Sequence, residues 1–155
     1  MMVLLQQKEL NLKPMGLGDL FEVVAIERQS YIKPWSFFLF LNELKDNEYA
    51  DYLVLKNENK VLGYGGMWNF YQYCHITNLA VAPVFRQKGY GCMLLGALLN
   101  RAGVRGARRV SLEVRATNGS ALRLYEKMGF REAGIKKGYY GDEDAVFMNI
   151  ALEDK

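Results

Sequence analysis

A short turn, Arg86-Gln87-Lys88-Gly89-Tyr90-Gly91, is the stretch whose residue types most directly suggest binding chemistry. It lies between a predicted strand that ends near Val81 and a predicted helix that begins near Tyr90. The first turn of a helix presents backbone N–H groups without intrahelical partners, and glycine has no Cβ to keep an anion at a distance. The turn therefore predicts a cradle for a phosphate or pyrophosphate group.

Neither of two common nucleotide-binding loops fits this turn. No Gly-Lys-Ser/Thr sequence follows it, as a Walker loop requires, and it lacks one glycine of the dinucleotide-binding fingerprint. Two glycines between a strand and a helix are also compatible with an ordinary tight turn. Both interpretations stay open when the turn is considered alone.

A glutamate in a strand pattern is a second candidate. Residues 110–114 alternate strictly, so Glu113 lies on the face opposite the apolar residues and shares that face with Arg115. A carboxylate there can serve as a general base, or it can simply pair with Arg115 on a solvated face. We interpret the lone histidine, His75, as a structural residue beside a strand.

Hydrophobic periodicity and turn residues predict the elements that must position these residues. The predicted strands are 8–13, 49–55, 61–68, 74–81, 110–114, 130–139 and 145–152, and the predicted helices are 19–29, 36–45, 90–101 and 120–128. The order is β-α-α-β-β-β-α-β-α-β-β. It predicts an α/β fold with a sheet of mixed direction.

Composition limits the classes of protein that fit. The 155 residues, of which 50% are hydrophobic, suit one folded domain spanning 1–155. No apolar run is long enough for a membrane span, Met1 to Leu5 lack the basic start of a secretory signal, and we expect a cytoplasmic protein. Cys74, Cys92 and His75 do not form a metal-binding pattern, and a net charge of +3 does not indicate a nucleic-acid partner.

Several separated motifs together resemble the Gcn5-related N-acetyltransferase (GNAT) family, over almost the whole chain. Arg86-x-x-Gly89-x-Gly91 is preceded by Leu79-Ala80-Val81-x-Pro83 and followed by Asn118 and by Leu124-Tyr125-Glu126-Lys127-Met128-Gly129-Phe130. The resemblance implies a mixed, mainly antiparallel sheet flanked by helices. It also implies acetyl-CoA as the co-substrate, with no metal.

Further segments resemble the branch of this family that acetylates the N-terminal alanine of a bacterial ribosomal protein, and its archaeal relatives. These segments are Ile26-Glu27 to Pro34-Trp35-Ser36, His75-Ile76-Thr77-Asn78, Leu112 to Asn118, and Gly138-Tyr139-Tyr140 followed by Glu143-Asp144-Ala145. One departure is that only Gly141-Asp142 separates Tyr140 from Glu143. The acceptor is therefore less firmly predicted than the reaction.

The resemblance also implies roles for individual residues. Glu113 matches the general base, and Tyr125 matches the tyrosine that meets the departing sulfur of coenzyme A, although a helix tyrosine can equally be a core residue. Asn118 matches a contact to coenzyme A and can also cap the next helix. The pantetheine arm would pair with the backbone of Leu79, Ala80 and Val81, and the pyrophosphate would lie on the backbone of Arg86, Gln87, Lys88, Gly89, Tyr90 and Gly91.

The acceptor slot implied by the resemblance is lined by Tyr31, Pro34, Trp35, Tyr139 and Tyr140. An α-amino group titrates near ~7.7–8.0 and a lysine near ~10.4, so deprotonating a lysine costs roughly 3 kcal/mol more. We therefore expect a protein N-terminus as acceptor, with a ribosomal-protein alanine first. Two alternatives stay open: a lysine or small-amine acetyltransferase, and a non-catalytic acyl-CoA-binding partner. We expect a monomer or weak dimer.

Overall fold

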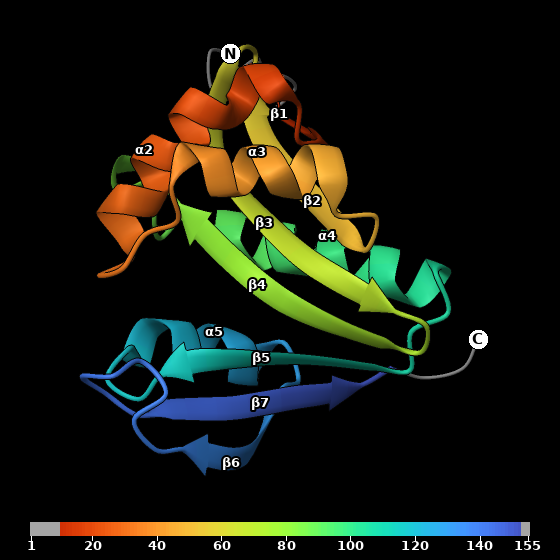
Figure 1. Ribbon diagram of the computed structural model, residues 1–155, viewed down its shortest axis with the longest axis vertical. Coiled ribbons are helices and arrows are strands. Elements are labelled where there is room, and N and C mark those ends of the chain that lie inside the picture. The colour runs from red at the N-terminus through yellow and green to blue at the C-terminus, as the bar shows by residue number, and fades with distance from the viewer. Residues whose placement is uncertain (1–9, 153–155) are drawn as a thin grey trace.

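One mixed β-sheet organises the protein, and the computed structural model describes residues 10–152 (Figure 1). Within these residues the sheet has seven strands in the order β1-β2-β3-β4-β5-β7-β6, and only β4 and β5 are parallel neighbours. The strands are β1 (Leu10–Pro14), β2 (Ala50–Asn57), β3 (Lys60–Phe70), β4 (Tyr73–Val81), β5 (Arg109–Arg115), β6 (Arg131–Lys136) and β7 (Ala145–Ala151).

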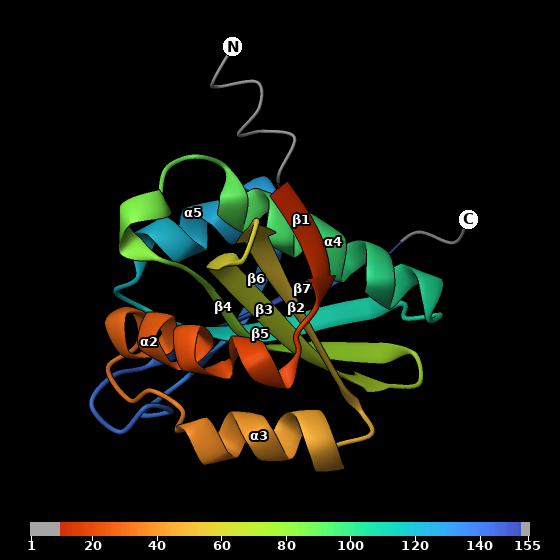
Figure 2. The same cartoon turned by 90° about the horizontal axis from the view of Figure 1, so that it is seen from above.

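Four α-helices in the described part of the chain cover the two faces of this sheet. They are α2 (Leu20–Ser30), α3 (Phe37–Asp46), α4 (Tyr90–Val104) and α5 (Gly119–Lys127), with 3-10 turns at Leu17–Asp19 and Pro83–Phe85. Helices α4 and α5 lie on one face and α2 and α3 on the other (Figure 2). Leu94, Leu95, Leu98 and Ala102 recur at helical spacing on α4 and are all fully buried. Burial of such apolar stripes forms two cores, one on each face.

Strands β4 and β5 pair over a short distance and then separate. Tyr73, Cys74 and His75 pair with residues 109–111 of β5, and the ladder ends there. The register between β3 and β4 shifts just beyond this point, so that Thr77 has no partner on β3. An extra residue of this kind is a β-bulge, and it bends the strand that carries it. The bulge thus turns β4 away from β5, and Figure 1 shows the two strands diverging toward their C-terminal ends.

The predicted order of elements and the mixed sheet are confirmed, and several boundaries are wrong. The helix predicted for 90–101 continues through Gly103 to Val104, and the strand predicted for 61–68 spans Lys60–Phe70. The strand predicted to reach Tyr139 ends at Lys136, because Gly138 has a positive φ of 63° and starts a turn. Pro14 was expected to stop β1 but is its last residue, which a strand at the edge of a sheet tolerates. The first two residues predicted for that strand lie outside the described residues, as does the N-terminal segment examined for a secretory signal.

Two further expectations concern membranes and thiols. Among residues 10–152, no helix combines the length and apolar character needed to cross a membrane. Cys74 and Cys92 are both free, and Cys74 is buried.

Candidate active site

A cleft of about 910 Å³ occupies the opening between β4 and β5. Its walls include the C-terminal half of β4, the turn before α4, the end of β5 and the start of α5. Volumes of this size are typical of sites for small molecules and cofactors. All three predicted pantetheine-pairing residues, Leu79, Ala80 and Val81, line this cleft.

The turn before α4 has the geometry of an anion cradle. Gly89 is the N-cap of α4 and has a φ of 84°, a left-handed conformation that glycine adopts without strain. An ideal Cβ built on Gly89 would meet no atom within 4 Å, so the space beside it is open. Gln87 also has a positive φ, of 63°. The cradle residues that line the cleft are Arg86, Gln87, Gly89, Tyr90 and Gly91, whereas Lys88 does not line it.

Arg86 braces this turn with its side chain. Its Nε donates to the Val81 carbonyl at 2.9 Å, and its Nη2 donates to the Ser30 hydroxyl at 3.0 Å. The guanidinium therefore links the end of β4 to the end of α2. Asn118 has the capping role that was one of its two predicted uses, since its side chain accepts from the Ala121 N–H at 3.2 Å. It also lines the cleft.

Tyr31 lies against the edge of β4 inside the same cleft. Its hydroxyl donates to the Leu79 carbonyl at 2.8 Å and accepts from the Leu79 N–H at 3.1 Å. Burial of its hydroxyl raises the pKa of Tyr31 far above its ordinary value, so the hydroxyl stays protonated. One side chain thus satisfies both backbone groups of Leu79 at the point where β4 has lost β5 as a neighbour.

Glu113 lies on β5 with its side chain 8% exposed. Its Oε2 is 2.9 Å from His75 Nε2, and its Oε1 accepts from Lys136 Nζ at 3.3 Å. Burial by itself raises the pKa of this carboxyl, but His75 and Lys136 outweigh burial and hold the pKa below its ordinary value. Among the described residues, no donor is aligned with Oε2 despite the short distance to His75, and the ionised carboxylate can accept a proton there.

Tyr125 of α5 lines the cleft and packs against Phe130, with ring centroids 5.7 Å apart. Burial raises the pKa of its hydroxyl above the ordinary value, and Tyr140 adds to the effect. The phenol therefore keeps its proton at neutral pH and can donate it. Tyr125 therefore packs in the core and also borders the cleft, and its contact with the departing sulfur stays a prediction.

A second cavity of about 230 Å³ adjoins Glu113. It is lined largely by aromatic side chains, and the full lining is Trp35, Trp68, His75, Ile76, Thr77, Glu113, Tyr139 and Tyr140. Trp35, Tyr139 and Tyr140 were predicted for the acceptor slot. Tyr31 lines only the larger cleft, and Pro34 lines neither cavity. Glu113 borders both cavities.

Two buried glutamates hold the tryptophans of the second cavity. Glu43 accepts from the Trp68 indole N–H at 2.5 Å and from the Tyr52 hydroxyl at 2.7 Å. Glu27 accepts from the Trp35 backbone N–H at 2.9 Å. Buried carboxylates with such partners fix the geometry of the groups that they bind.

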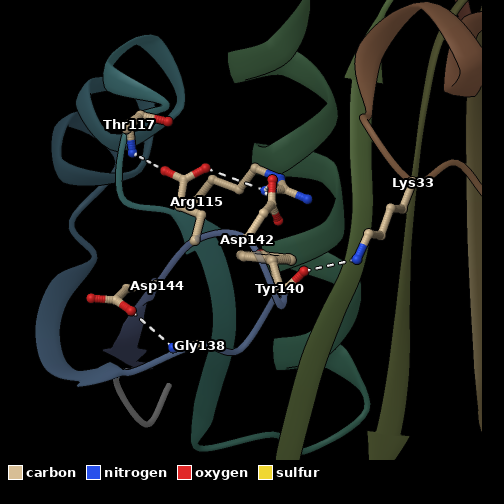
Figure 3. A network of polar contacts seen from close by, with 8 residues as sticks. Lys33, Arg115, Thr117, Gly138, Tyr140, Asp142 and Asp144 are labelled. Carbon is tan, nitrogen blue, oxygen red and sulfur yellow. Dashed lines mark hydrogen bonds and ion pairs between the residues drawn. The ribbon is translucent and has the colours of Figure 1, made fainter.

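A polar network fastens the loop that carries Tyr139 and Tyr140 (Figure 3). Arg115 pairs with Asp142 at 3.0 Å and with Glu143 at 3.2 Å, and its guanidinium lies 4.3 Å from the Tyr140 ring centre. Lys33, from the segment between α2 and α3, donates to the Tyr140 carbonyl at 2.9 Å. The proposed pairing of Glu113 with Arg115 is therefore wrong, because Arg115 bonds to this loop and Glu113 to His75 and Lys136.

Sequence reasoning missed four residues of this region. Trp68 and Thr77 line the second cavity, His75 contacts Glu113 rather than serving only the strand, and Lys136 reaches Glu113 from β6. The alternation of β4 places His75 beside Ser111, whose hydroxyl lies 2.8 Å from His75 Nδ1. Finding the contact of His75 with Glu113 required the pairing of residues 73–75 with residues 109–111, which only the fold shows.

Among residues 10–152, no group of histidine, cysteine, aspartate and glutamate side chains could hold a metal ion. The chemistry available is acid–base: an ionised carboxylate, a protonated phenol and a polarising backbone N–H, all at one opening in the sheet. These groups suit the transfer of a chemical group from a large ligand to a smaller one.

Comparison with known sequences finds relatives that match most of the chain. A protein of Bacillus subtilis (strain 168), provisionally named as a ribosomal protein bS18-alanine N-acetyltransferase, is 38% identical over 142 residues, which are 90% of this chain and 94% of that protein. The ribosomal protein bS18-alanine N-acetyltransferase of Haemophilus influenzae is 36% identical over 141 residues, which are 86% of this chain and 93% of that protein.

Solved structures agree with the sequence comparison. The ribosomal-protein-S18-alanine N-acetyltransferase of Escherichia coli superposes with a TM-score of 0.85 at 29% identity, covering 94% of this chain and 96% of its own. A GNAT family acetyltransferase of Elizabethkingia anophelis, solved with acetyl-CoA bound, shares the fold with a TM-score of 0.75 at 20% identity, covering 93% and 99%. The sequence profile described as the acetyltransferase (GNAT) family matches residues 20–130. With its bulged β4, its glycine turn and its open sheet, the chain belongs to the GNAT family of acetyltransferases.

Proposed function

We propose that the protein transfers the acetyl group of acetyl-CoA to the N-terminal α-amino group of a protein, with the alanine of a ribosomal protein as the leading acceptor. The observation that carries the proposal is the position of Glu113, a single carboxylate bordering both the 910 Å³ cleft and the 230 Å³ cavity. Transfer between two substrates needs a group that both can reach. The names of the relatives support the same acceptor.

On the donor side, the proposal assigns acetyl-CoA to the larger cleft. The N-terminal N–H groups of α4 would hold the pyrophosphate, and the Leu79 N–H would polarise the thioester carbonyl. The Tyr31 hydroxyl accepts a hydrogen bond from that N–H in the free protein, so this hydrogen bond must break when acetyl-CoA binds. Apart from Tyr125, which would meet the sulfur, the groups assigned here to hold acetyl-CoA are backbone groups.

On the acceptor side, the amine would enter through the aromatic cavity. Glu113 takes a proton from the incoming ammonium, and the neutral nitrogen attacks the thioester carbon. The carbon–sulfur bond then breaks, and the Tyr125 hydroxyl donates its proton to the departing sulfur. The nitrogen of the adduct loses its second proton to the Tyr125 phenolate through solvent, and Glu113 releases the proton that it took to solvent. The products are the acetylated amine, coenzyme A and one proton, so charge and protons balance.

The test uses two peptides incubated with the protein and acetyl-CoA. One has a free N-terminal alanine and no unblocked lysine, and the other has a blocked N-terminus and a free lysine. Mass spectrometry should find acetylation of the first peptide only. Modification of the lysine peptide alone would overturn the proposed acceptor while leaving the enzyme class intact.

A further inference from the structure

A row of aromatic rings continues outward from the second cavity along the turn between β3 and β4. On the two strands, Trp68 pairs with His75, and two residues further outward Phe70 pairs with Tyr73. Residues two apart on a strand share a face, so Phe70 and Tyr73 lie on the face that Trp68 and His75 present to the cavity. The surface is therefore continuous with the proposed acceptor site.

Ring contacts link these side chains. Trp68 and Phe70 have centroids 6.5 Å apart, and Phe70 and Tyr49 have centroids 5.1 Å apart. We call Tyr49, Phe70, Tyr71 and Tyr73 the aromatic strip. Their exposed fractions are 43%, 42%, 92% and 61%, so the rings offer apolar surface to solvent rather than to the core.

Tyr71 is the most exposed ring of the strip. Its φ is 55°, in the left-handed region, where a bulky side chain is uncommon and costs about 1–2 kcal/mol relative to glycine. Glycine or asparagine is the usual residue in a tight turn of this kind. With 92% of its surface exposed, the Tyr71 ring is available to contact a bound polypeptide.

The turn that carries the strip is fixed in place. The Arg108 N–H donates to the Gln72 carbonyl at 2.6 Å, and the Asn69 N–H donates to the Tyr49 carbonyl at 2.7 Å. The Cys74 thiol donates to the Asn69 side-chain oxygen at 2.8 Å. A rigid row of rings costs little ordering entropy when a ligand binds.

We propose that the aromatic strip binds the acceptor polypeptide beyond its first residues, and that it prefers apolar or aromatic side chains there. This inference rests on the proposed function, because it extends the acceptor site. An extended chain advances ~3.3 Å per residue, so a peptide whose amine reaches Glu113 past Trp68 would bring roughly its fourth to sixth residues over the strip. Charge does not favour another partner, since Glu48 adjoins Tyr49 and Arg109 pairs with Tyr73 in register.

The experiment compares three peptides with the same first two residues: a four-residue peptide, a ten-residue peptide with aromatic residues at positions four to six, and a ten-residue peptide with serines there. At saturating acetyl-CoA, the aromatic ten-residue peptide should have a KM about five- to tenfold lower than the serine peptide, the scale of one or two aromatic contacts. The kcat should be the same for all three.

Variants locate the effect. Tyr71→Asn and Tyr73→Ser should each raise the KM of the aromatic peptide toward that of the serine peptide and leave the four-residue peptide unchanged. Tyr71→Asn should keep or raise the melting temperature, because asparagine tolerates the left-handed conformation. Phe21→Ser is the matched control, since Phe21 is 79% exposed on α2, away from the turn.

Equal KM values for the two long peptides, or variants that keep the preference, would overturn the strip as an acceptor surface. Failure of the proposed function would look different, because no N-terminal peptide of any length would then be acetylated.

Discussion

The two cavities that meet at Glu113 are lined by different kinds of groups. In the larger cleft, the groups proposed to hold acetyl-CoA are mainly backbone groups of β4 and of the turn before α4, whereas aromatic residues from several separate segments line the smaller cavity. Backbone groups keep their positions when side chains change, so a backbone-lined cleft suits a substrate common to a family. Side chains can change one at a time, so the aromatic cavity is where the acceptor is chosen.

The largest expected effect falls on Glu113, the carboxylate that borders both cavities. Glu113→Gln should lower kcat by ~10²-fold or more, the scale of a general base, and leave the affinity for acetyl-CoA unchanged. Stopped-time assays with an N-terminal alanine peptide and calorimetry with acetyl-CoA would measure the two quantities. Glu132→Gln on β6 is the control, since Glu132 is exposed and lines neither cavity. Unchanged turnover in Glu113→Gln would remove the base from the mechanism.

Tyr125→Phe should also reduce kcat, by less than the glutamate change because thiolate is already a fair leaving group. We expect about a tenfold loss, at the low end for general acid catalysis. The acetyl-CoA affinity should stay the same, since the ring still packs against Phe130. Wild-type turnover with an unchanged pH profile would mean that Tyr125 only packs and that solvent supplies the proton.

Gly89→Val tests only the proposed acetyl-CoA site in the larger cleft. A β-branched residue at a φ of 84° is strained, and the local backbone must move, so acetyl-CoA should bind about tenfold more weakly. The thermal stabilisation by acetyl-CoA should shrink accordingly. Gly103→Val, at the far end of α4 where a Cβ would meet nothing within 4 Å, is the control. Equal acetyl-CoA binding by both variants would argue against the cradle.

Tyr31→Phe should tighten acetyl-CoA binding by about fivefold, because one net hydrogen bond of ~1 kcal/mol no longer has to be broken at Leu79. The free protein should melt at a lower temperature, since two backbone groups lose their partner. Tyr49→Phe, on the other side of the site, should do neither. Weaker binding by Tyr31→Phe would mean instead that the hydroxyl helps to hold the donor.

The smallest effect concerns pH. Lys136 helps to keep the pKa of Glu113 low, together with His75, so Lys136→Met should raise that pKa toward its ordinary value. Less carboxylate then exists at acidic pH, and the acid limb of kcat/KM should move to higher pH. Tyr139 and Tyr140 also face Glu113 but keep their protons in this range. Lys137→Met is the control, because Lys136 and not Lys137 pairs with Glu113, and it should leave the acid limb in place. An unmoved acid limb in Lys136→Met would show that Lys136 does not have this role.

Stability should follow the same sign. A carboxyl whose folded pKa is lowered stabilises the fold above its unfolded pKa, about 4.5, and the contribution is lost as the pH falls through the folded value. The free energy of unfolding of Lys136→Met should therefore fall less than that of the wild type as the pH is lowered from 5 to the acid transition. Chemical denaturation at a series of pH values would measure this difference.

The sequence could predict features of the site that depend on local patterns, but not contacts between residues far apart in the chain. Alternation along β5 placed Glu113 opposite the buried residues, and the glycine turn located α4, because both are local patterns. Partners of Glu113 were beyond reach, since His75 and Lys136 come from strands on either side of β5 and β7. Arg115 illustrates this limit. Glu113, two residues away, was its expected partner, but Arg115 bonds to Asp142 and Glu143, which are 27 and 28 residues away.

The role of Tyr31 also needed the fold. Aromatic residues near Trp35 could be assigned to a loop, but the contact of Tyr31 with Leu79 spans 48 residues and depends on the bulge that frees the edge of β4. The strand register that creates Thr77 as an extra residue has no local sequence signal.

The short ladder between β4 and β5 bears on how the protein unfolds. Because only residues 73–75 of β4 pair with β5, few backbone hydrogen bonds join strands β1 to β4 of the sheet to strands β5, β7 and β6. Side chains supply the remaining connection, since one buried cluster unites Met67 and Ile76 with Leu112 and Met148 through Leu98 of α4. Both parts should then lose hydrogen-exchange protection together, as one cooperative unit with α4 at its centre, although the sheet itself is nearly divided.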